Sequence, residues 1–193
     1  MVPVDDMPEL IFTVALAQEL PVEWLRERGW PVCRLAQLRA EGPRPLRGPV
    51  GVVLTGVGPR AAEQAARWIV AHLGPSYPIV VNLGTAGCPS GARPLGQFVV
   101  PELAVGPACP ALAIDPRLPF AWPRGLPLRR GGRLRSLPRP AVAAGEAETH
   151  LPADCVDMEA YGQAAVFRAA GVPFHVLKRI SDHGGSGAEA QFR

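Results

Sequence analysis

Short apolar runs alternate with helical patterns, and this alternation constrains the fold more than any other feature of the sequence. Apolar runs of strand length cover residues 10–16 and 50–55, and helical patterns follow them over 19–28 and from Pro59 to Gly74. Proline is favoured in the first turn of a helix, and glycine commonly ends one. Short runs without polar alternation are typical of strands buried in a parallel sheet. The pattern predicts an α/β fold.

The rest of the chain continues the alternation, apart from one segment. Residues 101–139 are rich in Pro, Arg and Gly and show no periodicity, so we expect mostly loop there. The other predicted elements are strands at 78–83, 97–100, 141–144 and 174–180, a glycine-rich loop at 84–87, and a helix over 158–170 that Gly171 ends. We therefore expect a single domain over residues 1–193, with a mixed, largely parallel twisted sheet flanked by helices. In such sheets, ligands bind at the carboxyl ends of the strands.

Composition and cysteine spacing indicate where the protein is located and whether it binds a metal. Apolar residues make up 48% of the chain and charged residues 19%, which is typical of a globular domain. We find no apolar run long enough to cross a membrane and no pattern of a secretion signal at the start. The cysteines at 33, 88, 109 and 155 lack the spacing of a zinc site, which predicts reduced thiols in a cytoplasmic protein without a metal.

Positive charge is concentrated in one segment. Lys178 is the only lysine, and seven arginines fall between Arg117 and Arg139. Such a stretch is compatible with a solvated loop or subunit contact, with a site for an anionic substrate, or with nucleic acid. Its prolines and glycines favour the first interpretation, so we do not expect nucleic acid as a partner.

Three acidic residues, Glu19, Glu159 and Asp182, fall at predicted strand ends or helix starts. Cleaving a ribosyl C–N bond requires an acid near the departing base, a carboxylate at the ribose and a group that activates water. Simpler interpretations exist for each residue. Asp157 or Glu159 could cap a helix, Ser181-Asp182 could form a turn, and Glu19 could belong to a first helical turn.

The chain resembles the nucleoside phosphorylase/nucleosidase superfamily, and it looks most like 5′-methylthioadenosine/S-adenosylhomocysteine nucleosidase. The resemblance covers most of residues 10–104 and 140–183, and the spacing of Glu159 and Asp182 is similar to that of the family. The stretches that carry it are Val14-Ala15-Leu16-Ala17-Gln18-Glu19, Val81-Asn82-Leu83-Gly84-Thr85-Ala86-Gly87, Val156-Asp157-Met158-Glu159-Ala160, and Val172-Pro173-Phe174 with Ile180-Ser181-Asp182.

This resemblance implies an enzyme, a purine nucleosidase, that releases the free base and a ribose derivative. It implies that Asp182 protonates N7 of the purine and that Glu19 holds or activates the attacking water. The substrate-binding residues that it implies are Glu159 at the ribose hydroxyls, Met158 against the sugar, Ser181 beside the acid, and Asp157, Thr85 and Gly87 in the pocket. It implies no metal or organic cofactor, and it implies a homodimer.

Residues near the predicted water favour hydrolysis over phosphorolysis. Phosphorylases of the superfamily carry arginines in the loop after the first strand and before the glycine of the third-strand loop. Here the first loop contains Glu19, which would repel phosphate, and the second position is the neutral Asn82. Arg60, just beyond Gly56-Val57-Gly58, is the nearest residue that argues for phosphate.

Other stretches depart from the family and leave alternatives open. Residues 143–149 contain no aromatic side chain to stack on adenine, residues 101–139 lack the family's tyrosine-bearing stretch, and the sequence ends soon after Asp182, without the terminal helix that the family is expected to have. The alternatives are a futalosine hydrolase, whose substrate carboxylate the arginines at 117–139 would meet, a phosphate-dependent phosphorylase, and a non-catalytic protein that binds a nucleoside or a partner subunit.

Overall fold

A computed structural model describes residues 7–73, 78–107, 109–138 and 153–183. In these ranges, 11 strands form one mixed sheet. The strands are β1 (Leu10–Val14), β2 (Val32–Arg34), β3 (Val50–Leu54), β4 (Ile79–Gly87), β5 (Phe98–Val100), β6 (Leu103–Val105), β7 (Leu112–Ala113), β8 (Leu128–Arg130), β9 (Arg133–Ser136), β10 (Cys155–Asp157) and β11 (Phe174–Asp182). The main path through the sheet is β2-β3-β1-β4-β10-β9-β6-β7, with β11, β5 and β8 branching from β4. The predicted α/β fold with a largely parallel sheet is confirmed.

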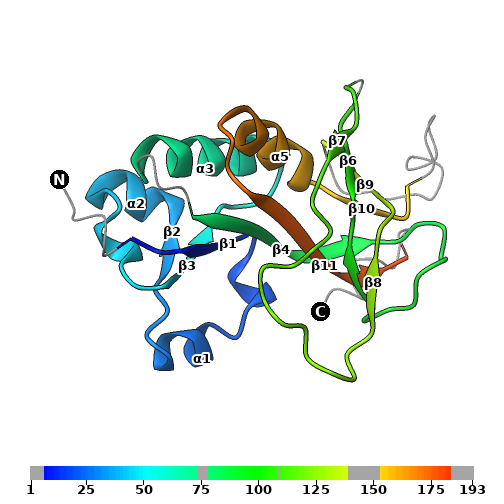
Figure 1. The fold of residues 1–193 in the computed structure, drawn as a ribbon, viewed down its shortest axis with the longest axis horizontal. Helices are drawn as coiled ribbons and strands as arrows, with labels where there is room; N and C mark the ends of the chain where they lie inside the picture. The colour runs from blue at the N-terminus through cyan, green and yellow to red at the C-terminus, as the bar shows by residue number, and fades with distance from the viewer. Residues whose placement is uncertain (1–6, 74–77, 108, 139–152, 184–193) are drawn as a thin grey trace.

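Helices cover both faces of the sheet. The helices α2 (Leu35–Glu41), α3 (Pro59–His72) and α5 (Ala160–Ala169) lie on one side, and α1 (Val22–Glu27) lies on the other (Figure 1). The larger core lies beneath α3 and α5, where Phe167 is fully buried and stacks on Phe174 of β11 at a ring-centroid distance of 5.2 Å. These two helices therefore rest on the strands that carry the candidate site.

The segment between β1 and β3 differs in part from the prediction. The helix expected over 19–28 is a 3₁₀ turn at Ala17–Glu19 followed by α1, and Pro21 lies between them. Proline has no N–H group to continue a helical hydrogen-bond ladder, which explains the break. Gly29, at φ 71°, follows the helix as expected. The structure adds β2 and α2, which the sequence pattern did not indicate.

The glycine-rich stretch Gly84-Thr85-Ala86-Gly87 is not the loop that we expected, because β4 continues through it as a strand. On one side, β4 pairs with β11 from Val80 to Gly87. On the other side, β1 pairs only as far as Asn82, and β10 pairs only at Gly87. Residues 83–86 therefore have a strand partner on one side only.

The segment from 101 to 138 is also less irregular than expected. It contains β6, β7, β8 and β9, each between 2 and 4 residues long. Strands this short are too brief to show periodicity, and β6, β8 and β9 gain their order from parallel pairing with distant strands. The strand expected at 141–144 and the last arginine of the basic stretch, Arg139, lie outside the described residues.

Candidate active site

Glu19 lies beside residues 83–86 of β4, on the side where this stretch has no strand partner. Its Oε1 accepts hydrogen bonds from the Thr85 backbone N–H and from the Thr85 hydroxyl, both at 2.8 Å, and its Oε2 accepts one from the Leu16 N–H at 3.1 Å. The carboxylate thus takes the backbone hydrogen bond that a neighbouring strand would otherwise take. Gly84 makes this close approach possible, because a Cβ there would lie 3.0 Å from Glu19 Oε1.

Glu159 is buried at the start of α5, at 6% exposure. Its Oε1 accepts a hydrogen bond from the Gly58 N–H at 2.8 Å, and its Oε2 accepts one from the Met158 N–H at 3.3 Å. The turn before α3 therefore contacts the start of α5, and the terminal methyl of Met158 lies 3.7 Å from the position of a Cβ on Gly58. Burial raises the pKa of the Glu159 carboxyl, although the charge of Lys178 acts in the opposite direction.

Asp157 and Lys178 form an ion pair inside the protein. The Lys178 Nζ lies 3.0 Å from Asp157 Oδ2, and the exposed fractions of the two side chains are 3% and 1%. Asp157 also accepts hydrogen bonds from the Ser136 hydroxyl at 2.5 Å and from the Ala160 N–H at 3.0 Å. Asp157 thus binds the first backbone N–H of α5, close to the capping role that one of the simpler interpretations proposed, although the N-cap residue is Glu159. It also holds the lysine.

Lys178 is a candidate site residue that the sequence analysis did not select. Burial lowers the pKa of its ammonium, but the charges of Asp157, Glu159 and Glu19 outweigh burial, and the pKa is raised. One cation thus faces carboxylates from β10, the start of α5 and the loop after β1. The signal in the sequence was the only lysine of the chain, placed in the apolar strand Phe174-His175-Val176-Leu177-Lys178.

Asp182 is the last residue of β11, directly after an irregularity in the pairing with β4 between Ile180 and Asp182. The Ser181 hydroxyl is 2.7 Å from Asp182 Oδ2, to which it donates, and 3.4 Å from the Ala86 carbonyl oxygen. A Cβ at Gly87 would lie 3.0 Å from Asp182 Oδ1, so a glycine lets the carboxyl lie against β4. His183 contacts the Arg93 carbonyl oxygen through Nε2 at 2.9 Å.

The structure arranges the predicted residues in two groups along β4. Glu19, Thr85, Asp157 and Glu159 share the surroundings of Lys178 or contact each other, while Ser181 and Asp182 lie at Gly87, near the carboxyl end of the strand. Asn82 lies deeper, at 1% exposure, and its amide has no hydrogen-bond partner among the described residues.

Within the described ranges, no cluster of three or more His, Cys, Asp or Glu side chains has the arrangement of a metal site, and no helix could span a membrane.

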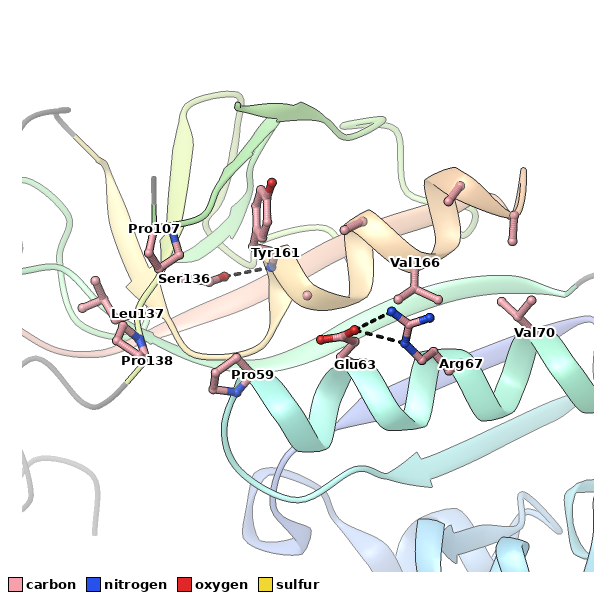
Figure 2. Close-up of a pocket in the computed structure, with 14 residues that line it drawn as sticks. Pro59, Glu63, Arg67, Val70, Pro107, Ser136, Leu137, Pro138, Tyr161 and Val166 are labelled. Atoms are coloured by element: carbon pink, nitrogen blue, oxygen red, sulfur yellow. Dashed lines mark hydrogen bonds and ion pairs between the residues drawn. The ribbon is translucent and has the colours of Figure 1, made fainter. Parts of the chain in front are cut away.

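A cavity of about 630 Å³ lies between α3 and α5 (Figure 2), apart from the carboxylates of Glu19, Glu159 and Asp182. Its walls are mainly apolar and include Val70, Tyr161 and Val166, while an ion pair between Glu63 and Arg67 lies on its α3 side. Ser136, at one end, connects the cavity to the site, because its hydroxyl also accepts a hydrogen bond from the Tyr161 N–H at 2.8 Å.

The raised pKa of Glu159 predicts a pH-dependent difference between the wild type and Glu159→Gln. An acid with a raised folded-state pKa ionises first in the unfolded chain, so its contribution to stability is present below pH 4.5 and is lost as pH rises through the folded pKa. Glutamine does not titrate and still offers an oxygen to the Gly58 N–H. The free energy of unfolding of the variant, relative to wild type, should therefore increase over this window in urea titrations at a series of pH values. Exposed Glu27→Gln is the control, and parallel pH profiles for Glu159→Gln and wild type would contradict the prediction.

The sequence matches no protein-family model and no curated protein. Solved structures do resemble the fold. The 5′-methylthioadenosine/S-adenosylhomocysteine nucleosidase of Neisseria meningitidis, in complex with methylthio-immucillin-A, has a TM-score of 0.70 at 19% identity, over 95% of this chain and 90% of that one. The same nucleosidase from Helicobacter pylori, with butyl-thio-DADMe-Immucillin-A, has a TM-score of 0.70 at 16% identity, over 96% and 90%.

A further solved structure extends the comparison to a second substrate class. A futalosine hydrolase mutant of Helicobacter pylori has a TM-score of 0.67 at 14% identity, over 96% of this chain and 90% of that one. Identities this low establish the likeness of the fold alone. This chain shares its fold with these solved nucleosidase and hydrolase structures.

Proposed function

We propose that this protein hydrolyses the N-glycosidic bond of a purine nucleoside derivative of the methylthioadenosine or adenosylhomocysteine type. The observation that carries the proposal is the position of Glu19, whose carboxylate accepts hydrogen bonds from Thr85 on the side of β4 that lacks a strand partner there. A carboxylate repels a phosphate dianion but accepts a proton from water, so the nucleophile that this position favours is water. The products are the free base and a ribose derivative.

The remaining residues then take complementary roles. Asp182 protonates the purine at N7 as the C–N bond breaks, and Ser181 orients its carboxyl through the hydrogen bond to Oδ2. Glu159 accepts hydrogen bonds from the ribose hydroxyls, with Met158 against the sugar. Because Glu159 is buried, its charge is only weakly screened by water as the ribose becomes cationic in the transition state.

Asp157 and Lys178 hold these residues in position from inside the protein. Asp157 was predicted as a substrate contact, but its two oxygens already contact Ser136, Ala160 and Lys178 inside the protein. We therefore assign it a positioning role, in which it holds the start of α5 and the lysine. Lys178 in turn lowers the electrostatic cost of gathering Glu19, Asp157 and Glu159 in one place. Thr85 fixes Glu19, and Gly87 leaves room for Asp182.

Futalosine hydrolysis is the second candidate, favoured by the fold likeness to the Helicobacter pylori enzyme. It would need a cation for the substrate carboxylate. Within the basic stretch, Arg129 and Arg130 lie on β8, which is separated from β4 by β5 and β11. Arg133 and Arg135 lie on β9, which pairs with β10. Arg117 is highly exposed and paired with Asp115.

Base release from a panel of nucleosides tests the function. We expect release from methylthioadenosine or adenosylhomocysteine in phosphate-free buffer, measured by chromatography, with no acceleration on adding phosphate. Release from futalosine alone would replace the first candidate with the second. Base release that requires phosphate would contradict the hydrolase proposal. If neither base release nor nucleoside binding is detected, the protein is non-catalytic.

Asp182→Asn tests the role of the acid. The amide cannot protonate the base, so we expect kcat to fall by about 10²- to 10⁴-fold, while KM changes by only a few-fold. Steady-state kinetics measures both constants, and Asp115→Asn, at a partly exposed aspartate, is the matched control. Comparable losses in kcat and in substrate binding would assign Asp182 a structural role instead.

We further infer that the protein acts as a cytoplasmic homodimer. The two copies would meet along the cavity between α3 and α5, which forms an open groove (Figure 2). The groove is mainly apolar, and its exposed Glu63–Arg67 pair suits a two-fold contact, because each charge can meet the opposite charge of the second copy.

An arginine introduced on an exposed helix face tests this contact. Ala169 lines the groove on α5 and is exposed, so Ala169→Arg should leave the fold intact and yield a monomer in light scattering. Ala36→Arg, on the exposed face of α2, should leave the dimer unchanged. A wild-type monomer at micromolar concentration, or a dimer that survives Ala169→Arg, would contradict the inference.

A further inference from the structure

Two cysteines face each other across the short contact between β4 and β10. The two strands are antiparallel, and Val156 pairs with Gly87. In antiparallel pairing, one step forward on one strand matches one step back on the other, so Cys155 lies opposite Cys88, directly after β4. Both are buried, at 2% and 0% exposure, and both belong to the core beneath α3 and α5.

The hydrogen-bond pattern specifies which kind of pair this is. The Cys88 N–H donates to the Asp182 carbonyl of β11 at 2.8 Å, so the backbone of Cys88 points away from β10. Cys88 and Cys155 are therefore a non-hydrogen-bonded pair, in which the Cα atoms lie about 4.5 Å apart and the side chains are at their closest. This separation falls within the range that a disulfide spans.

The other described cysteines have no comparable partner. The Cys33 Sγ is 3.5 Å from the Pro45 carbonyl oxygen at the far edge of the sheet, and Cys109 is exposed. Cys88 has one further polar contact, with the Ser90 hydroxyl at 3.6 Å. The Cys88–Cys155 pair is thus the one that geometry prepares for cross-linking within the described ranges.

Burial controls when the pair can react. Burial raises the pKa of the Cys155 thiol, and the neighbouring charge of Asp157 raises it further, so the closed protein holds little of the reactive thiolate. However, β10 is joined to β4 through a single paired position, Val156 with Gly87. Reaction with a disulfide therefore requires a local opening of this short contact, while β10 keeps its three paired positions with β9.

We propose that Cys88 and Cys155 are a redox modification site, which a small-molecule disulfide such as oxidised glutathione converts into a cross-strand disulfide. One cysteine thiolate attacks the glutathione disulfide, forming a mixed disulfide and releasing one glutathione. The second cysteine then displaces the other glutathione. The protein thiols lose two electrons and two protons, and the products are one protein S–S bond and two glutathione thiols.

This bond would join β10 to β4 directly beneath the candidate site. Cys155 stands two residues before Asp157, and Cys88 follows Gly87, against which Asp182 lies. The disulfide would therefore stabilise the strand contact that precedes the Asp157–Lys178 pair. It would also close a long loop of chain, which restricts the unfolded state. The proposal does not depend on the nucleosidase activity.

Peptide mapping of the full-length wild-type protein tests the proposal. The protein is incubated with oxidised glutathione under native conditions, the remaining thiols are alkylated, and the peptides are identified by mass spectrometry. We expect a cross-linked peptide pair containing Cys88 and Cys155, which reductant removes, with Cys33 still alkylated as a free thiol. The oxidised protein should melt about 10 °C higher than the reduced protein.

Variants separate the cross-link from other effects of oxidation. The rise in melting temperature should disappear in Cys88→Ser and in Cys155→Ser, and it should persist in Cys33→Ser, a matched change at another buried cysteine. Because the mapping uses wild-type protein, it remains decisive if a serine variant fails to fold. Glutathione adducts on Cys109 alone, a different cysteine pairing, or free Cys88 and Cys155 after prolonged oxidation would each overturn the proposal.

Discussion

The candidate site depends on one constraint, a stretch of β4 that has no strand partner on one side. β1 stops pairing at Asn82 and β10 pairs only at Gly87, so the backbone between them needs other hydrogen-bond partners. Glu19 meets part of this need by accepting a hydrogen bond from the Thr85 N–H, and it also accepts one from the Thr85 hydroxyl. The same break in pairing lets a carboxylate approach the centre of the sheet, where a continuous strand would exclude it.

The buried ammonium of Lys178 stabilises the group of acidic side chains beside β4. A buried carboxylate without a counter-charge is costly, and here Asp157 and Glu159 are both buried while Glu19 lies nearby. One buried ammonium, 3.0 Å from Asp157, offsets this cost. Burial keeps the pKa of the Glu159 carboxyl raised, although the charge of Lys178 lowers it. Electrostatics and strand pairing thus act on the same few residues.

Sequence patterns located the longer elements and the acidic residues at their ends, because burial and periodicity are local properties. The run at 50–55 and the helix from Pro59 were recognisable, and Glu19, Glu159 and Asp182 stand at element ends as expected. The stretch 84–87 was misassigned, since its glycines suggest a turn when read alone. In the folded protein, these glycines provide space for the carboxylates of Glu19 and Asp182 beside a strand. The roles of these acids in catalysis stay predictions.

The sequence by itself determined the alternation of strands and helices, the α/β class and the identity of the candidate acids. Each of these follows from neighbours along the chain. Only the tertiary structure decided that Lys178 faces Asp157, that Thr85 holds Glu19 and that Val156 pairs with Gly87. These contacts join residues far apart in sequence, and they depend on strand order and register, which the chemistry of a single segment does not specify.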